Sequence, residues 1–267
     1  MKIKNFQKDK NSISENKINW LVGIILGDGR VSERYVRIYN NDRNIIQMCK
    51  DIFQYNLKIP KNKFKTRMLS KNRNGYKRNA ETIELGINST VFAKEFKNLT
   101  SKQLNNPKPY FMRGLFDAEG SVDLAGNIIL WQRKDELGTT VSESIERFLK
   151  TYKIKYRIIN NEDFYIFEIL GRYKHYQNLT KFSEIVGFSS KQKLKDLNLI
   201  INIFSKRTFV KNQEIIKFVS KNKEVTLRDV IEKFEITKIN GYTMLKKLVD
   251  ENKIKKIKSY PNIYKIC

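Results

Sequence analysis

The sequence predicts an α+β protein in which an αββαββα unit occurs twice and a small helical domain follows. The first observation is an apolar segment, Leu21–Gly29, that recurs with changes as Met112–Gly120. Each copy has the length of a short helix and ends in an acidic residue followed by glycine. The second observation is that a similar order of predicted helices and strands follows both copies. The third is a change of pattern near residue 207, beyond which short helices replace the strands.

Residues 1–100 make up the first predicted half. The polar, lysine-rich stretch 1–15 is expected to be a frayed arm, and apolar residues four positions apart predict a helix over 16–28. Periodicity and turn signals predict the other elements, which are strands at 35–40, 61–68 and 81–87, helices at 44–55 and 88–99, and a hairpin around Asn74-Gly75.

The segment 61–80 is strongly basic, with eight lysines and arginines and no acid. In the strand predicted at 61–68, basic residues alternate with Phe64, Thr66 and Met68, which gives one basic face and one largely apolar face. Lysines also blunt exposed sheet edges, so a solvated edge strand is the alternative. In so basic a protein, we favour contact with phosphates.

Residues 101–206 are predicted to hold a linker and the second half. Two prolines mark 100–109 as the linker. The order of the first half then repeats, with helices at 111–119, 140–152 and 174–185 and strands at 127–132, 153–158 and 163–170. The strand at 153–158 again alternates basic and apolar residues. A further helix at 191–204 is expected to pack across the two halves.

Residues 207–267 are predicted to form a small separate domain. Thr226 opens its second helix, and Asp229 completes a capping box there. The other predicted elements are helices at 213–219 and from about 238, and strands at 253–258 and 262–266. Three helices and a hairpin of this size are typical of a winged helix-turn-helix, whose second helix usually enters the DNA major groove. The alternative is a small cap that packs on the core.

The amino-acid composition limits the classes of function that this chain can have. The 267 residues include 53 Lys and Arg against 28 Asp and Glu, which gives a net charge of +25. Such an excess favours a polyanionic partner, although a coding bias toward lysine would give part of it. Two cysteines and the single His175 argue against a disulfide framework, a zinc cluster, a His-based nuclease site and a Ser-His-Asp triad. No apolar run has the length of a membrane span, so we expect a soluble, intracellular protein.

The two repeated segments are spaced for close helix packing. Gly23 and Gly27 share one face of the first helix, and Gly114 and Ala118 share one face of the second. Glycine inside a helix costs about 1 kcal/mol relative to alanine, so two in one short helix need a reason. Contact between the two helix backbones through these small residues supplies it.

Both helices end in an acid, Asp28 in the first and Glu119 in the second. A helix C-terminus carries partial negative charge, and two carboxylates brought together there also repel each other. A divalent cation between them removes both problems. It also supplies what phosphodiester hydrolysis needs, an activated water and neutralisation of charge on the phosphate.

These features resemble the LAGLIDADG homing endonucleases, in the form that carries two motifs on one chain. The resemblance covers about residues 16–205. It implies that the two motif helices pack together at a pseudo-twofold axis and that two curved antiparallel sheets bind duplex DNA. It also implies that Asp28 and Glu119, with Gly27 and Ala118 beside them, bind Mg²⁺ or Mn²⁺.

The same family places polar and basic residues near the two acids. By position, the resemblance makes Asn40 and Gln132 the candidate catalytic residues that follow the second strand of each half. Arg133, Lys134 and Arg172 are the candidates for the nearby basic residue, and the sequence leaves the choice among them open.

The resemblance and the basic strand faces together give a set of candidate DNA contacts. On the predicted sheets and their turns these are Arg37, Lys61, Lys63, Lys65, Arg67, Arg73, Lys77, Arg78, Arg133, Lys134, Lys153, Lys155, Arg157 and Arg172. On the third helix of the C-terminal domain they are Lys238, Asn240 and Lys246.

The resemblance implies a site-specific, divalent-metal-dependent endonuclease that cuts both strands of a long duplex. We expect a monomer, located with the nucleoid in the cytoplasm or in an organelle if organelle-encoded. A non-cleaving transcription regulator that joins a degenerate LAGLIDADG domain to a helix-turn-helix is the first alternative, ranked second because both acids are retained. An RNA maturase that binds intron RNA on the same scaffold is the other alternative.

Overall fold

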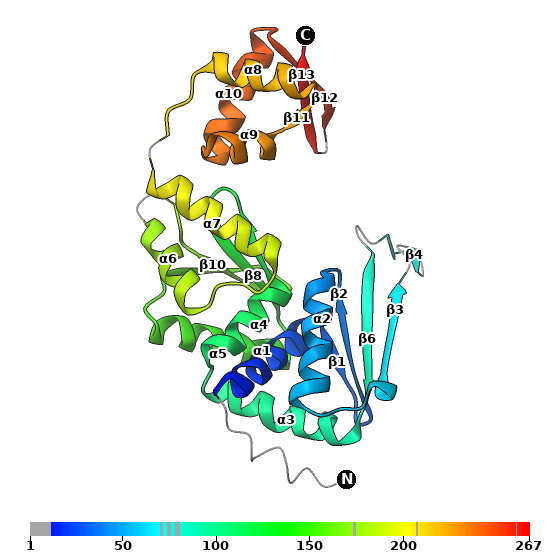
Figure 1. The fold of residues 1–267 in the computed structure, drawn as a ribbon. Helices are drawn as coiled ribbons and strands as arrows, with labels where there is room; N and C mark the ends of the chain where they lie inside the picture. The colour runs from blue at the N-terminus through cyan, green and yellow to red at the C-terminus, as the bar shows by residue number, and fades with distance from the viewer. Residues whose placement is uncertain are drawn as a thin grey trace. The chain divides into compact units, whose positions relative to one another are not determined.

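The computed structural model of the protein describes residues 12–69, 72–73, 76–77, 81–172, 175–206, 208–259 and 261–267. Residues 1–11 of the predicted arm, the predicted hairpin tip at Asn74-Gly75 and the candidate contact Arg78 lie outside these ranges. The fold is α+β, with two four-stranded antiparallel sheets and a small C-terminal sheet accompanied by helices (Figure 1). Among the described residues, no helix is both long enough and apolar enough to cross a membrane.

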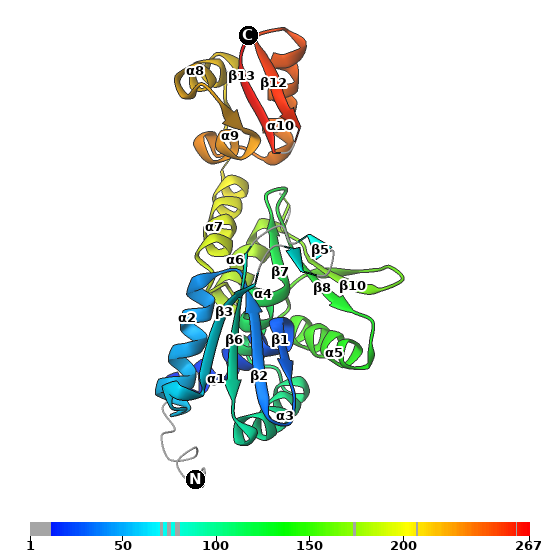
Figure 2. The same ribbon diagram turned by 90° about the vertical axis from the view of Figure 1, so that its right-hand side faces the viewer.

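The first half is built on the sheet β1-β2-β6-β3, whose strands lie side by side in Figure 2. Alternation along the strands puts Val36, Ile38 and Leu85 on the core face, where each is at most 1% exposed. The elements are α1 (Ser12–Asp28), β1 (Gly29–Val31), β2 (Tyr35–Asn40), α2 (Arg43–Asp51), the π-helix η1 (Ile52–Asn56), the 3₁₀ turn η2 (Lys61–Lys63), β3 (Phe64–Leu69), β4 (Asn72–Arg73), β5 (Tyr76–Lys77), β6 (Thr82–Asn88) and α3 (Thr90–Asn105). Strands β4 and β5 form the predicted hairpin, with Arg73 opposite Tyr76.

The second half repeats this arrangement. Its sheet has the order β7-β8-β10-β9, so in both four-stranded sheets the first strand lies next to the second, and the last strand lies between the second and the third. The elements are α4 (Pro109–Glu119), β7 (Gly120–Asp123), β8 (Asn127–Arg133), α5 (Glu136–Thr151), β9 (Tyr156–Asn160), β10 (Phe164–Ile169), α6 (Tyr176–Ile185) and α7 (Lys191–Ser205). The predicted duplication of element order is therefore present in the structure.

The basic strands are shorter than the sequence predicts. Pro60 starts the turn η2, in which the Lys63 N–H donates to the Pro60 carbonyl at 3.0 Å, so the strand begins only at Phe64. In the second half, Lys153 adopts a left-handed conformation (φ 52°) and its N–H donates to Lys150 O at 3.0 Å, closing α5. The predictions that Lys61 and Lys63, or Lys153 and Lys155, lie on strand faces are therefore wrong.

The predicted linker at 100–109 is mostly helix. Helix α3 continues to Asn105 because Gln103 is buried, where its side-chain amide donates to Asn19 Oδ1 at 2.8 Å. Helix α4 then begins at Pro109, a favoured first helical residue because its missing N–H would be unsatisfied there anyway. The connection between the halves is thus only three residues long.

Helices α1 and α4 pack backbone to backbone, as their small residues predict. A Cβ atom added at Gly114 would lie 2.0 Å from the Trp20 carbonyl oxygen, and one at Gly23 would lie 2.2 Å from Phe111 O. At the next contact along the pair, a Cβ at Gly27 would lie 2.6 Å from the Ala118 methyl group. Only glycine fits at these crossings, and the contact carries the two helix ends toward each other.

The C-terminal residues form a small unit with its own core. Its elements are α8 (Asn212–Asn222), β11 (Val225–Thr226), α9 (Leu227–Phe234), α10 (Lys238–Asp250), β12 (Ile254–Ser259) and β13 (Asn262–Ile266), with the sheet order β11-β13-β12. Ile215, Val230 and Leu245 from the three helices are fully buried together with Tyr264 of β13. The predicted capping box is present, since Thr226 and Asp229 exchange hydrogen bonds at the start of α9.

Candidate functional site

The two motif acids meet at the C-terminal ends of α1 and α4. The Cγ and Oε1 atoms of Glu119 lie 3.0 and 3.7 Å from the position that a Cβ atom would take at Gly27, next to Asp28. The charge on Asp28 raises the pKa of Glu119, which is a further sign of their proximity. The structure thus brings together four of the residues predicted for the metal site, which are Asp28, Glu119, Gly27 and Ala118.

Burial makes both acids reluctant to ionise. It raises the pKa of Asp28 to about 6, although a hydrogen bond from Asn40 and the charge on Lys193 act in the opposite direction. Burial and then the charge on Asp28 raise the pKa of Glu119 to about 7, again against the charge on Lys193. Two partly buried carboxylates with raised pKa values form a site where a cation would be favoured.

Asn40, at the end of β2, holds Asp28 in place. Its side-chain N–H donates to Asp28 Oδ2 at 2.6 Å, while its Oδ1 accepts the N–H of Asp42 at 2.7 Å. Gln132, the candidate at the matching position of the second half, is half-buried on β8, and its side chain forms no hydrogen bond with a described residue. The position after the second strand therefore identifies a residue that bonds to the motif acid in the first half. In the second half, Gln132 at the same position does not bond to Glu119.

Lys193 is the functional candidate that sequence reasoning missed. It lies in the first turn of α7, and its Nζ donates to the carbonyl oxygens of Phe116, at 3.2 Å, and Asp117, where α4 ends. Burial lowers the pKa of Lys193, while the charges of Asp117, Asp28 and Glu119 raise it. A lysine there offsets the negative helix end and both acids. In the sequence it is one of 53 basic residues, with nothing to distinguish it.

Asp117, two positions before Glu119, has a structural role. Its carboxylate accepts the indole N–H of Trp20 at 2.8 Å and the backbone N–H groups of Ser189 and Ser190 at 2.9 and 3.1 Å. These bonds tie α1, α4 and the start of α7 together. Leu26 stands at the matching position of the first motif, so only one of the two motifs makes this connection.

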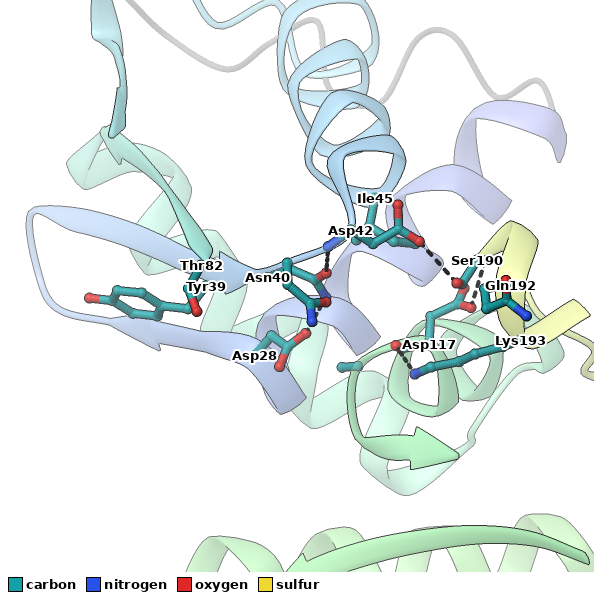
Figure 3. A pocket seen from close by; sticks show the side chains of 12 residues that line it. Asp28, Tyr39, Asn40, Asp42, Ile45, Thr82, Asp117, Ser190, Gln192 and Lys193 are labelled. Atoms are coloured by element: carbon teal, nitrogen blue, oxygen red, sulfur yellow. Dashed lines mark hydrogen bonds between the residues drawn. The ribbon is translucent and has the colours of Figure 1, made fainter. Parts of the chain in front are cut away.

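Asp28, Asn40, Asp117 and Lys193 line a pocket of about 770 Å³, whereas Glu119 is not among its lining residues. Figure 3 shows Asp28 with Asn40 on one side and Lys193 with Asp117 on the other. Asp42 joins the two sides, because the Ser190 hydroxyl donates to its Oδ2 at 2.9 Å. The lining residues are Asp28, Tyr39, Asn40, Asn41, Asp42, Ile45, Thr82, Asp117, Ala118, Ser190, Gln192 and Lys193.

The donor set fits a hard divalent cation. Glu119 accepts no hydrogen bond from any described residue, so both its oxygens are available to a ligand, and Asp28 has one oxygen outside its bond to Asn40. Among the described residues, no group of three or more His, Cys, Asp or Glu side chains is arranged to hold a metal ion. Mg²⁺ suits such a site, because it is usually held by one or two carboxylates and keeps several waters.

The candidate DNA contacts fall into three groups. Arg37, Lys65 and Arg67 lie on one face of the first sheet, where Arg67 donates to the buried Glu84 at 2.8 Å. Exposed residues on turns, strand ends and helices are Lys61, Lys63, Arg133, Lys134, Lys153, Lys155, Arg157, Arg172, Asn240 and Lys246. Arg73 and Lys77 belong to the β4-β5 hairpin. Lys238, on α10, forms an ion pair with Asp123 at 2.9 Å, as Arg157 does with Glu168 and Arg67 with Glu84.

The raised pKa values predict a pH-dependent stability of the metal-free protein. A folded-state pKa of about 7 against 4.5 means that the folded protein holds the Glu119 proton more tightly than the unfolded chain does. The free energy of unfolding should therefore fall as pH rises from 4.5 through 7, by about 3 kcal/mol. Urea denaturation of wild type and Glu119→Gln across this range measures the difference. Parallel curves for the two proteins would refute this assignment.

Comparison with known proteins supports the fold. The family model described as a LAGLIDADG-like domain matches residues 106–235. I-DmoI in complex with DNA and Ca is similar at a TM-score of 0.52 and 16% identity, covering 69% of this chain and 98% of that one. An I-DmoI variant with its target DNA and Mn gives 0.50 and 17%, covering 66% and 96%. Full-length DUF199/WhiA from Thermatoga maritima gives 0.49 and 16%, covering 92% and 94%.

No curated protein sequence matches this chain significantly. The identities to the solved structures are low, so what the two I-DmoI likenesses establish is the architecture of the two sheets and the helix pair. The protein has the LAGLIDADG-like domain fold.

Proposed function

We propose that this protein is a site-specific, divalent-metal-dependent endonuclease that hydrolyses phosphodiesters on both strands of duplex DNA. The observation that carries the proposal is the meeting of two partly buried carboxylates, Asp28 and Glu119, beside the partly buried Lys193. The net charge of +25 and the basic face of the first sheet favour a nucleic acid as substrate. The similar I-DmoI structures contain DNA with Ca or Mn.

The residues at the ends of the two motif helices have separate roles in this proposal. Asp28 and Glu119 hold Mg²⁺ or Mn²⁺, with the Gly27 and Ala118 backbones beside them. When bound, the cation supplies an activated water and neutralises charge that builds on the phosphate. Asn40 fixes the rotamer of Asp28 by donating to one oxygen, which leaves the other directed to the ligand.

Lys193 supplies a positive charge near the two acids. Its ammonium group is held by the carbonyl oxygens at the end of α4, so the side chain is already oriented along the pocket. Its lowered pKa makes it suited to hold a proton close to the reacting phosphate and to release it. It also limits the mutual repulsion of the two acids before a cation binds.

Replacement of Lys193 by Met should reduce DNA cleavage about 10²- to 10⁴-fold, the usual contribution of a positioned acid–base group. Since the lysine charge lowers the pKa values of Asp28 and Glu119, its loss should also move the rate–pH profile to higher pH. The matched control is Lys191→Met, an exposed lysine two positions earlier. Equal cleavage rates for the two variants would exclude a role for Lys193.

DNA binding in the proposal uses the open sheet faces, with the C-terminal unit lengthening the contact. We propose that this unit is a winged helix-turn-helix, because α9 and α10 precede the β12-β13 hairpin and Asn240 and Lys246 are exposed on α10. In this proposal, the first half comprises residues 1–100, the linker and second half comprise 101–206, and the C-terminal domain comprises 207–267.

The test begins with selection of duplexes from a randomised library by the full chain in EDTA. Selected duplexes are then incubated with the protein and Mg²⁺, and both strands are analysed for cut ends. The proposal expects cleavage of both strands by the wild type and none by the Asp28→Ala, Glu119→Ala double variant. Sequence-specific binding without cleavage in any divalent metal would instead favour a regulator. Preference for intron RNA over duplex DNA would favour a maturase.

A further inference from the structure

The open face of the second sheet is unexpectedly apolar. Ile128 and Leu130 of β8 are fully buried, so the residues that alternate with them point to the other side, where Trp131 is 43% exposed. Trp131 packs edge-on against Phe164 of β10, with 5.8 Å between ring centroids. We call this surface the aromatic face, which comprises Ile129, Trp131, Ile159, Phe164 and Ile166.

Two further contacts confirm which side these residues occupy. Phe167 of β10 is fully buried and packs on the Tyr156 ring at 6.3 Å, which places both on the core side of the sheet. Arg157, one residue after Tyr156, pairs instead with Glu168 on the opposite side. Ile159 follows Arg157 by two positions and is 42% exposed, so it shares that side.

The corresponding face of the first sheet has a different chemistry. Lys65 lies opposite Gly86, and Arg67 lies opposite Glu84, next to Arg37 on β2. Arg30 of β1 is the cross-strand partner of Arg37 and adds a fourth cation. We call this surface the basic face, which comprises Arg30, Arg37, Lys65 and Arg67 around Glu84.

Glu84 gives the basic face a fixed geometry. The side chain is 8% exposed, and its two oxygens contact Arg67 at 2.8 Å and Arg37 at 3.9 Å. A guanidinium bound on one side by a carboxylate has a defined plane and still presents other N–H donors. Arg67 remains half exposed, so those donors are accessible to a ligand over the sheet.

These two surfaces match different groups of the DNA major groove. Arginine and lysine donate to the O6 and N7 acceptors of guanine, whereas apolar side chains contact the C5-methyl group of thymine. We propose that the two halves read chemically different half-sites, with the basic face on guanine-rich and the aromatic face on thymine-rich sequence. This inference rests on the proposed binding of duplex DNA.

Charge and fold favour DNA as the occupant of the aromatic face. Arg133 is exposed at the end of β8 and borders the apolar residues with a positive charge, and Arg157 on the same side of the sheet is ion-paired with Glu168. The sheet also has the same strand order as the sheet that carries the basic face. An apolar centre with cationic borders suits a groove that presents methyl groups between two phosphate backbones.

The experiment uses base analogues in a duplex that the full chain selects from a randomised library in EDTA. Deoxyuridine replaces thymine to remove the methyl group, and 7-deazaguanine replaces guanine to remove N7, in one half of the site at a time. We expect deoxyuridine to weaken binding in one half only, about fourfold for each contacted methyl. We expect 7-deazaguanine to weaken binding in the other half, about fivefold to hundredfold for each contacted guanine.

Protein variants assign each effect to a sheet. Trp131→Ala should remove the deoxyuridine effect and keep the 7-deazaguanine effect, and Arg67→Ala should do the reverse. Lys65→Ala repeats the second test without breaking the Arg67–Glu84 ion pair. Tyr55→Ala is the matched control, because Tyr55 is 60% exposed on η1, outside both sheet faces. It should change neither effect.

The possible results separate this inference from the proposed function. Binding in which both analogues act equally in both halves, or in which Trp131→Ala leaves the deoxyuridine effect intact, would overturn the half-site assignment alone. Failure to select any duplex would overturn the proposed function and the half-site assignment with it.

Discussion

Replacement of Asp28 by Asn is expected to lower the rate of DNA cleavage by at least about a thousandfold while duplex binding is retained. The substitution keeps the shape of the side chain but removes a charged ligand, and charge stabilisation at such a metal site is worth several kcal/mol. Glu119→Gln should have the same effect, because the two acids form one site. Cleavage is measured on a duplex selected by the wild type, in Mg²⁺.

Folding should survive both substitutions. Each removes a carboxylate whose ionisation in the metal-free protein is disfavoured by burial, so the free energy of unfolding above pH 7 should be equal to or larger than that of the wild type. The matched control is Glu33→Gln, an exposed acid in the β1-β2 turn, which should change neither property. Cleavage by Asp28→Asn at the wild-type rate would show that the acids are not the metal ligands.

The second large effect is expected at the crossing of the motif helices. In Gly114→Ala the new methyl group would lie 2.0 Å from the Trp20 carbonyl oxygen and 3.0 Å from Ile24 N. Backbone atoms cannot move aside as a side chain can, so the helices must separate. We expect a loss of about 3 kcal/mol in the free energy of unfolding, at the upper end of overpacking effects, measured by urea denaturation.

Gly241 offers a matched control for this substitution. It is also a buried helical glycine, in α10, but its nearest neighbour is the Leu227 Cδ1 atom at 3.2 Å, the end of a flexible side chain. Gly241→Ala should stay within about 1 kcal/mol of the wild type, because a small displacement is offset by the better helix propensity of alanine. Equal stability of both variants would contradict the close helix packing.

The helix pair could be predicted from the sequence because its signal is local. Glycines four positions apart and a terminal acid are visible in nine residues, and their repetition identifies the partner helix. The boundaries of the basic strands are hard to predict, because the local alternation of basic and apolar residues does not show where a strand begins. Alternation continues through Lys61 and Lys153, while a proline-initiated turn and a helix C-cap decide the backbone there.

The surroundings of the acids could not be predicted in this way. Lys193 reaches the end of α4 from 76 positions away, and Ser190 reaches Asp42 from 148 positions away. Such contacts depend on where the start of α7 lies in the fold, and the periodicity of the sequence does not predict this position. The chemistry of the two open faces also needs the structure, because the strand register shows that Arg67 faces Glu84 and the exposure of Trp131 shows that it faces outward.

A decisive measurement of metal-dependent cleavage uses a selected duplex, placed in a supercoiled plasmid, with the full chain in Mg²⁺. We expect a linear product that requires the divalent cation and that Asp28→Asn does not form. Tight, sequence-specific binding with the plasmid left supercoiled in both Mg²⁺ and Mn²⁺ would contradict it and leave a protein that binds DNA without cutting it.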